Sequence, residues 1–392
     1  MSKELKDIAQ ELKDANKKVQ LIYAFNGTGK TRLSREFKEL IAPNNNGDEG
    51  VDQTELSRKK ILYYNAFTED LFYWDNDLNG DEDRKLKIHP NAFTKWILED
   101  QGQGPTIIDH FQRLTNSNIE PTFNADFSEI SFAIRGDGQG SPIKISKGEE
   151  SNLIWSMFYS LLELIIEELS SSEDDRGTDD FNGLKYVFID DPVSSLDDNH
   201  LIELAVDLAK LVKSSSADLK FIVTTHNPLF YNVLSNEFNN KLAKDPNAET
   251  IEWVYKPSES VKSRLDKNVD GTFAITKLDR KTPFSYHLLL LSEIRDAIQD
   301  NQIKKYHFNF LRNILEKTTT FLGHDKWENL LPKAADGNPD PFANRILNLS
   351  SHSAHAGEET GELEANDKEK LEDLVNFLST EYGFWKQEAS NE

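Results

Sequence analysis

The segment AFNGTGKT, residues 24–31, constrains the fold of this chain more strongly than any other segment. It follows VQLIY, an apolar run typical of a buried strand, and precedes TRLSREFKELI, whose apolar residues recur at helical spacing. Small residues between a strand and a helix let backbone N–H groups approach phosphate oxygens at the helix N-terminus. The sequence therefore predicts a nucleotide-binding P-loop within an α/β domain.

The residues of this P-loop have separate expected roles. Ala24 stands where the pattern usually has its first glycine. Lys30 is expected to reach the β- and γ-phosphates, and the Thr31 hydroxyl is expected to ligate Mg²⁺. The turn before them is expected to bind the phosphates through Asn26, Gly27, Thr28 and Gly29.

An acidic strand end supplies the second element of a nucleotide-hydrolysing site. In YVFIDDPVSSLDD, residues 186–198, an apolar strand runs into two adjacent carboxylates. We expect Asp190 to hold Mg²⁺, directly or through water, and Asp191 to activate the attacking water. This strand end resembles that of ABC-type ATPases, which normally carry a water-activating glutamate at the position of Asp191. Because aspartate is one methylene shorter, the resemblance implies hydrolysis that is slow or needs help.

Two further segments each carry a weaker signal. ISKGEES, residues 145–151, places a serine and a glycine before a helix, so Ser146, Gly148 and Glu149 are candidate nucleotide contacts. In FIVTTHNP, residues 221–228, His226 follows a predicted strand and is a candidate contact of the γ-phosphate.

These four segments follow one another in the order of an ABC-type ATPase, which this part of the chain resembles. The resemblance implies ATP or GTP with Mg²⁺ as the ligand. It also implies at least a dimer, because the serine–glycine signature of one protomer closes on the P-loop nucleotide of another. Ser195, Leu196 and Asp197 are then expected near the seam.

Composition restricts the class of protein. The 392 residues contain no cysteine, which excludes disulfides and thiolate metal sites, and no apolar run long enough to span a membrane. We therefore expect a cytoplasmic protein without a membrane partner. The net charge of −23 argues against non-specific coating of nucleic acid, but 13 Lys or Arg and nine Asp or Glu give residues 262–333 a net charge of +4.

The pattern of apolar residues changes along the chain. Strand and helix patterns alternate up to about residue 260, and helical patterns follow. We expect an α/β ATPase domain over residues 1–260 and an all-α domain over 261–392. Residues 261–284 are expected to be a linker or recognition segment.

The helical part contains one constellation suited to RNA cleavage. Arg312 and Glu316 lie four residues apart on one helix face, and Arg345 precedes His352 by seven residues. Arginine can stabilise a phosphorane, while glutamate and histidine can exchange protons with the ribose 2′-OH and the leaving 5′-oxygen without a metal ion. An intrahelical ion pair and a surface histidine are the simpler interpretations. The spacing does not rank the other histidines of this part, which are His287, His307, His324 and His355.

Three kinds of ABC-type protein compete at this point. A transporter ATPase would need a membrane partner, and a chromosome or repair ATPase would carry a long coiled coil between the P-loop and the signature. The third kind is an ATPase whose helical tail is an effector enzyme. Of the other two kinds, the repair type stays open as the alternative: a DNA-associated ATPase whose tail is a partner-binding module.

Long strings of the chain resemble the PrrC family of bacterial anticodon nucleases. They are LIYAFNGTGKTRLSR, RKKILYYNAFTEDLFYWDND, KGEESN, LKYVFIDDPVSSLDDNHLIELAV and FSYHL. The family joins an ABC-type ATPase to a C-terminal ribonuclease related to HEPN domains. The spacing of Arg345 and His352 matches the Arg-x-x-x-x-x-x-His mark of HEPN domains.

The resemblance implies a specific biology. The family's nuclease triad corresponds to Arg312, Glu316 and His352, and cleavage of tRNA-Lys is implied on the 5′ side of the wobble base. The enzyme would be latent, silenced by a type I restriction–modification complex until a phage disables that complex, and dTTP would stabilise the active form. We expect the tRNA-reading segment to include Asp279, Arg280 and Lys281.

Overall fold

The computed structural model describes most of the chain, with gaps. The described residues are 2–43, 60–65, 72–76, 84–88, 96–115, 117–136, 143–192, 198–245, 252–268, 270–278, 284–334, 337–341, 343, 347 and 365–384. They form two compact units, Met1–Pro283 and Phe284–Glu392. Each unit is described by itself.

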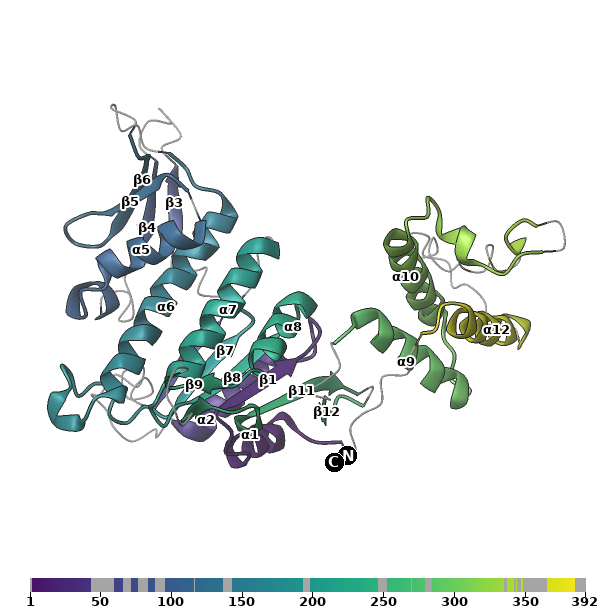
Figure 1. Cartoon of the computed structure of the whole chain (residues 1–392), viewed down its shortest axis with the longest axis horizontal. Coiled ribbons are helices and arrows are strands. Elements are labelled where there is room, and N and C mark those ends of the chain that lie inside the picture. The colour runs from purple at the N-terminus through teal and green to yellow at the C-terminus, as the bar shows by residue number, and fades with distance from the viewer. Residues whose placement is uncertain are drawn as a thin grey trace. The chain divides into compact units, whose positions relative to one another are not determined.

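A six-stranded sheet organises the first unit (Figure 1). Its order is β12-β11-β1-β8-β7-β2, and all neighbouring pairs are parallel except β11 with β12. The strands are β1 (Val19–Tyr23), β2 (Ile61–Asn65), β7 (Tyr186–Asp190), β8 (Lys220–Thr225), β11 (Ser260–Lys267) and β12 (Phe273–Lys277). Every residue of β1 and of β7 is buried, as their largely apolar sequences predict for central parallel strands.

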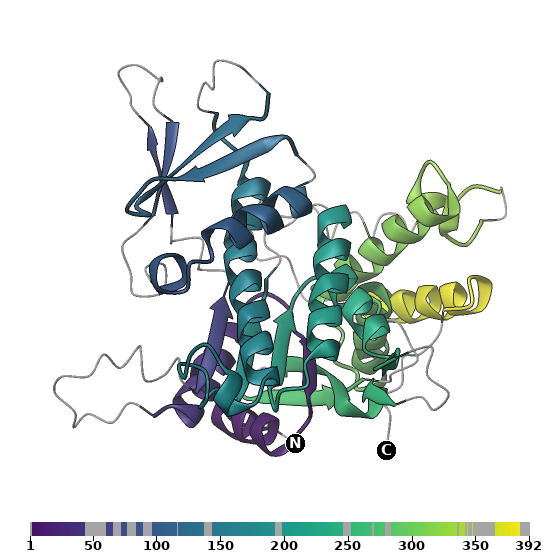
Figure 2. The ribbon, with the colours of Figure 1, turned by 60° about the vertical axis from the view of Figure 1, so that its left-hand side comes forward.

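Helices cover both faces of this sheet, as Figure 1 and Figure 2 show. On one face, Ile22 of β1 belongs to a core shared with α1 (Leu5–Asp14) and α2 (Lys30–Ile41). On the other face, the ring of Tyr23 meets that of Tyr231 on α8 (Pro228–Glu237), with 5.8 Å between centroids. The helices α6 (Lys147–Ser170) and α7 (Asp198–Ser214) lie beside α8. This α/β layering confirms the predicted fold class of the first unit.

A second sheet was not expected. Its order is β3-β4-β6-β5, and all of its neighbouring pairs are antiparallel. The strands are β3 (Phe72–Asn76), β4 (Arg84–Ile88), β5 (Ile119–Phe123) and β6 (Glu129–Ile134). The helix α5 (Gly104–Thr115) joins this sheet to α6, and η2 (Trp96–Asp100) precedes it. Among the described residues, this sheet fills much of the interval between the P-loop and the signature.

Several short elements complete the first unit. The strands β9 (Leu242–Ala243) and β10 (Trp253–Tyr255) pair with each other. Two 3₁₀ turns, η3 (Glu173–Asp175) and η4 (Pro257–Glu259), lie in the connections.

The predicted boundary at residue 260 is wrong. Residues 260–277 form β11 and β12 of the main sheet, and the two compact units divide after Pro283. Lys262, which we assigned to a basic recognition segment, is 2% exposed. Its ammonium donates to the Ser235 carbonyl at 2.7 Å and to Asn239 Oδ1 at 2.6 Å. Carbonyl and amide oxygens therefore stabilise a lysine inside a strand, where its charge had indicated a surface.

The described elements of the second unit are helical. They are α9 (Tyr286–Gln299), α10 (Lys305–Leu322), η5 (Trp327–Leu330) and α12 (Ala365–Glu381). Their apolar residues recur at helical spacing and share one core, including Leu291 and Ile294 of α9, Phe308 and Leu311 of α10, and Leu374 of α12. None of the helices in the described part of the chain is long and apolar enough to cross a membrane.

Candidate functional site

The P-loop has the backbone geometry of a phosphate cradle. It connects β1 to α2, and α2 begins at Lys30. Gly27 and Gly29 have φ angles of 78° and 105°, in the region that favours glycine. A Cβ at Gly29 would lie 3.2 Å from Cε1 of Phe273, so the loop also packs closely against β12. Both glycines therefore meet a conformational requirement, and Gly29 also meets a steric one.

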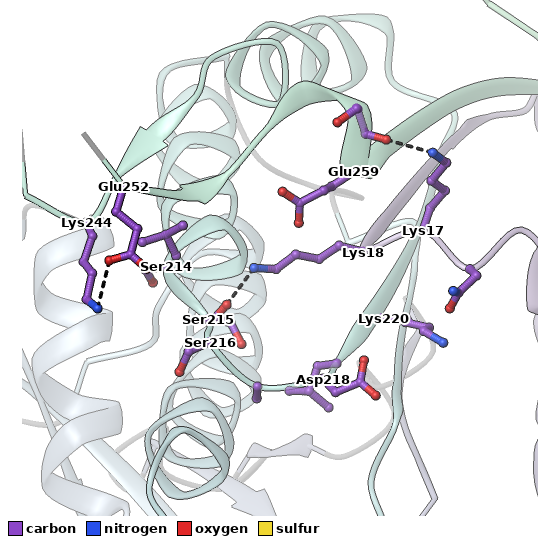
Figure 3. A pocket seen from close by; sticks show the side chains of 15 residues that line it. Lys17, Lys18, Ser214, Ser215, Ser216, Asp218, Lys220, Lys244, Glu252 and Glu259 are labelled. Carbon is purple, nitrogen blue, oxygen red and sulfur yellow. Dashed lines mark hydrogen bonds and ion pairs between the residues drawn. The ribbon is translucent and has the colours of Figure 1, made fainter. Parts of the chain in front are cut away.

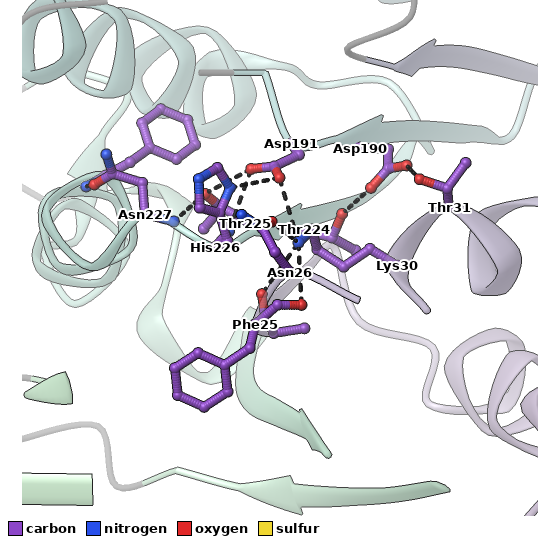
Figure 4. Close-up of polar contacts among 12 residues, drawn as sticks. Phe25, Asn26, Lys30, Thr31, Asp190, Asp191, Thr224, Thr225, His226 and Asn227 are labelled. Atoms are coloured by element: carbon purple, nitrogen blue, oxygen red, sulfur yellow. Dashed lines mark hydrogen bonds and ion pairs between the residues drawn. The ribbon is translucent and has the colours of Figure 1, made fainter. Parts of the chain in front are cut away.

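Lys30 lies over this loop with its side chain 8% exposed (Figure 4). Its ammonium donates to the carbonyls of Ala24 and Phe25, at 3.2 and 3.3 Å, and to Asn26 Oδ1 at 3.2 Å. It also pairs with Asp191 Oδ2 at 3.3 Å. These oxygens hold the cation at the mouth of the loop, where a nucleotide phosphate could replace some of them.

Asp190, at the end of β7, is hydrogen-bonded to both α2 and β8. Its Oδ2 accepts from the Thr31 hydroxyl at 2.9 Å, and its Oδ1 accepts from the Thr224 hydroxyl at 2.6 Å. Burial raises the pKa of Asp190 above its ordinary value, and the two hydroxyls only partly oppose that effect. A buried carboxylate beside a threonine hydroxyl supplies the hard oxygen ligands that Mg²⁺ prefers, so both residues fit the predicted metal site.

Asp191 has the reverse electrostatic balance. Burial alone would raise the pKa of this carboxyl, but hydrogen bonding to His226 and the charge of Lys30 outweigh burial and lower it. Asp191 Oδ2 lies 2.6 Å from His226 Nδ1, and Oδ1 accepts from the His226 N–H at 3.2 Å and the Thr225 hydroxyl at 3.3 Å. Asp191 therefore stays ionised in the folded protein.

The backbone at Asp191 is also unusual. Its φ is 53°, a left-handed conformation that aspartate tolerates better than most side chains but that still costs free energy. This conformation turns the chain directly after β7, where the carboxylate meets His226 and Lys30. Such outliers cluster at functional sites.

The sheet order explains why these residues meet. The strand β8 lies between β1 and β7, and all three are parallel, so their carboxyl ends share one edge. The register pairs Asp190 with Thr224. Sequence reasoning missed Thr224 and Thr225, although their position directly before His226 was the available signal.

The signature residues form a separate structure at the start of α6. Ser146 is the N-cap: its hydroxyl accepts from the Glu149 N–H at 3.3 Å, and its own N–H donates to Glu149 Oε2 at 2.6 Å. This capping box satisfies N–H groups at the helix N-terminus. Gly148 lies within the same first turn. A helix N-terminus with a serine hydroxyl can bind an anion once the Glu149 carboxylate moves away.

In the second unit, Arg312 and Glu316 form the predicted pair on α10. Arg312 Nε donates to Glu316 Oε1 at 2.8 Å, and the guanidinium carbon lies 5.5 Å from the ring centroid of Trp327. Trp327 is 8% exposed, so its ring is a fixed support for the guanidinium. Glu316 is half exposed and can reach a ligand from solvent.

The rival histidines differ in their surroundings. His307 is buried at the start of α10, where its Nδ1 accepts from the Lys304 N–H at 2.9 Å, so it has a capping role. His287 Nε2 lies 3.0 Å from Asn313 Oδ1, and burial lowers the pKa of both histidines. Other predicted residues lie outside the described residues, namely Arg345, His352, His355, residues 195–197 and residues 279–281.

A polar cavity of about 830 Å³ lies at the amino ends of β1 and β8, whereas the candidate nucleotide site lies at their carboxyl ends (Figure 3). Lys17 donates to the Ser258 carbonyl at 2.8 Å, and Lys18 donates to the Ser215 carbonyl at 2.6 Å. Burial lowers the pKa of Lys18 despite the opposing charge of Glu259. The P-loop follows the carboxyl end of β1, so this cavity is distinct from the candidate nucleotide site.

One family model and three known proteins are similar to this chain. The family model, described as "AAA domain", matches residues 109–379. The curated "Anticodon nuclease" of Escherichia coli is 49% identical over 418 aligned residues that cover 100% of both chains.

Two solved structures are similar at much lower identity. "Crystal structure of the SmcHead bound to the C-winged helix domain of ScpA" is 11% identical, with a TM-score of 0.34 and coverage of 68% of this chain and 91% of the other. "SMC head domain from Thermotoga maritima" is 15% identical, with a TM-score of 0.28 and coverage of 67% and 90%. At these TM-scores, the fold assignment rests on the strand order described above.

Proposed function

Because this chain belongs to the PrrC family of anticodon nucleases, we propose that it cleaves tRNA in the anticodon loop under the control of its ATPase domain. One observation carries the proposal: the 49% identity extends over the whole of both chains, so it includes the P-loop part and the helical part alike. The Arg312–Glu316 pair on α10 supports the nuclease half of the proposal.

The proposed cleavage is an attack within the RNA backbone. A base removes the ribose 2′-OH proton, the 2′-oxygen bonds to phosphorus, and the 5′-oxygen leaves with a proton from an acid. Arg312 neutralises the charge that develops on the phosphorane, and Trp327 keeps its guanidinium in place. Glu316 and His352 share the base and acid roles. The products are a 2′,3′-cyclic phosphate and a 5′-OH.

The proposed substrate is tRNA-Lys, cut on the 5′ side of the wobble base. Asp279, Arg280 and Lys281 would read the anticodon stem and loop, since basic side chains bind phosphates and a carboxylate can accept from a base edge. Arg345 would complete a HEPN-like arrangement with His352.

The ATPase domain is proposed to control whether the nuclease is latent or active. Lys30 and the P-loop N–H groups would bind the phosphates of ATP or GTP, and Thr31 and Asp190 would hold Mg²⁺. Asp191 would orient the attacking water, and His226 would contact the γ-phosphate. When bound, Mg²⁺ neutralises phosphate charge.

Pairing of two chains would complete each nucleotide site. Ser146, Gly148 and Glu149 of one protomer would close on the P-loop of its partner, which brings two nuclease units into one assembly. A type I restriction–modification complex would hold this assembly silent, and dTTP would stabilise its active form.

Cleavage of total bacterial tRNA tests the nuclease. The purified protein is incubated with nucleotide in EDTA or in Mg²⁺, and the cut ends are mapped. We expect one cut in an anticodon loop with a cyclic phosphate end, lost in Arg312→Ala and Glu316→Gln but kept in the control Asp325→Asn. No cut under any nucleotide condition, together with ATP hydrolysis stimulated by DNA, would refute the proposal.

A further inference from the structure

The cavity at the amino ends of β1 and β8 lies within the first unit, and no residue of the candidate nucleotide site lines it (Figure 3). Its volume of about 830 Å³ falls in the range of about 300–1,000 Å³ that is typical of small-molecule sites. The lining includes four lysines and three acidic residues, so its net charge is +1 within a chain of −23. This polar cavity therefore suits a small ligand that carries negative charge.

Two lysines of the lining keep their positive charge without a carboxylate partner. Lys17 donates to the Ser258 carbonyl at 2.8 Å, and Lys18 donates to the carbonyls of Ser215 and Lys213 at 2.6 and 3.5 Å. Among the described residues, neither ammonium forms an ion pair. Carbonyl oxygens orient these cations and cap α7, but they do not neutralise the charge. Because an ammonium group has three N–H donors, each lysine keeps at least one for a ligand.

Ser215 supplies an independent observation. It lines the cavity and is 1% exposed, and its hydroxyl oxygen is buried without a hydrogen-bond partner in the part of the chain that the structure describes. A buried hydroxyl without a partner costs free energy, so such groups usually bond to a ligand or to ordered water. The adjoining cavity could hold that partner. Burial also lowers the pKa of Lys18, and an anion beside it would favour its ammonium form.

The other side chains of the lining indicate what else the ligand carries. None of the described lining residues is aromatic, so the cavity offers no ring on which a nucleobase could stack. Asp218 and Glu259 can accept hydrogen bonds from hydroxyl groups, and the Ser216 hydroxyl can donate or accept. Lysine ammonium groups are common partners of phosphate. A molecule with one phosphate and several hydroxyl groups matches this set of side chains.

We propose that this cavity binds a sugar phosphate, with the phosphate against Lys18 and Ser215 and the sugar hydroxyls against Asp218 and Glu259. This site is additional to the proposed nucleotide and tRNA sites and does not depend on either. Lys18 directly precedes β1, and Lys220 of the lining begins β8. The ligand would therefore contact the start of the two strands whose carboxyl ends lead into the P-loop and His226.

Titration calorimetry with glucose 1-phosphate tests the proposal on the full chain. Glucose and inorganic phosphate are titrated separately, because each carries one half of the chemistry. Lys18→Gln removes the cation, and Ser216→Asp adds a negative charge at an exposed position of the lining. Lys210→Gln is the matched control, since this lysine is exposed on α7 and lies outside the cavity. Each titration is repeated with saturating ADP and Mg²⁺, which occupy the P-loop.

We expect glucose 1-phosphate to bind more tightly than glucose or inorganic phosphate, with or without ADP. Lys18→Gln and Ser216→Asp should each weaken binding about tenfold or more, the effect of losing one bond to a charged group, and Lys210→Gln should not. Absence of binding, or equal binding in Ser216→Asp and the wild-type protein, would overturn the proposal. Equal affinity for inorganic phosphate would overturn the assignment of a sugar phosphate. If thermal unfolding shows that Lys18→Gln does not fold, Ser216→Asp decides alone.

Discussion

Replacing Asp191 by asparagine is expected to destabilise the nucleotide-free protein, whereas the same change at Asp190 is expected to stabilise it. The two carboxylates are adjacent in the chain, and both are largely buried, but their pKa values shift in opposite directions. The folded protein therefore favours the ionised form of Asp191 and disfavours the ionised form of Asp190. An amide has nearly the same shape as a carboxyl and carries no charge. Replacing either aspartate by asparagine therefore removes mainly the effect of the negative charge on stability.

The magnitudes follow from the contacts. The amide in Asp191→Asn would keep an acceptor oxygen but lose the ion pair with Lys30 and the charge-assisted bond with His226. Hydrogen bonds to charged groups contribute about 1.5–3 kcal/mol each to stability. Part of this loss is offset because the variant no longer buries a negative charge. We therefore expect Asp191→Asn to lower the free energy of unfolding by about 2 kcal/mol. In Asp190→Asn the hydroxyls of Thr31 and Thr224 can rotate to suit an amide, and we expect a gain of roughly 1 kcal/mol.

Urea unfolding in EDTA without nucleotide measures both changes, at pH values from 8 down to 4. Asp191 has a lowered folded pKa, so its contribution is present above the unfolded pKa of about 4 and is lost as pH falls through the folded pKa. Asp190 has a raised folded pKa, so the penalty of its charge is full at neutral pH and fades as pH falls through that pKa. Equal signs for the two variants at pH 7 would refute the electrostatic argument.

Three further predictions concern the P-loop and the nuclease pair. Lys30→Ala should abolish nucleotide binding by calorimetry and every nucleotide effect on cleavage, while the chemistry at Arg312 stays intact; unchanged nucleotide effects would contradict the P-loop role. Gly29→Ala should cost about 1–3 kcal/mol in thermal unfolding, because its φ of 105° and the ring of Phe273 both oppose a Cβ. Trp327→Leu should lower kcat about threefold to tenfold at unchanged KM, as expected for one lost cation–π contact, and Trp327→Phe should restore most of it; equal kcat in both variants would argue against the support role.

Local sequence was sufficient to predict the strand, turn and helix that carry the nucleotide site. A strand, a glycine turn and a helix are adjacent in the chain, so the P-loop could be predicted without tertiary information. Asp190 and Asp191 were placed by the same logic, at the end of an apolar run. Which residues face them was not predictable, because the pairing of Asp190 with Thr224 depends on the register between β7 and β8.

The misplaced boundary has a different cause. The sequence of β11 contains Lys262, Arg264, Asp266 and Lys267, which local reasoning assigns to a surface or linker. Its burial depends on oxygen atoms from α8 and the residues after it, which accept from Lys262. In the second unit, four-residue spacing did predict that Arg312 and Glu316 would meet, because that contact lies within one helix.

The position of β11 limits how such a protein can be divided or recombined. It pairs with β1 along the whole strand, from Val19 with Ser260 to Tyr23 with Arg264. A fragment that ends at residue 260, where the composition changes, would leave the N–H and C=O groups of β1 that bond β11 unpaired, while β1 would keep its pairing with β8. Open strand edges of this kind recruit other chains and cause aggregation. The cut that preserves a foldable ATPase lies after Pro283, so exchange of nuclease parts between relatives should tolerate a junction there and fail at 260.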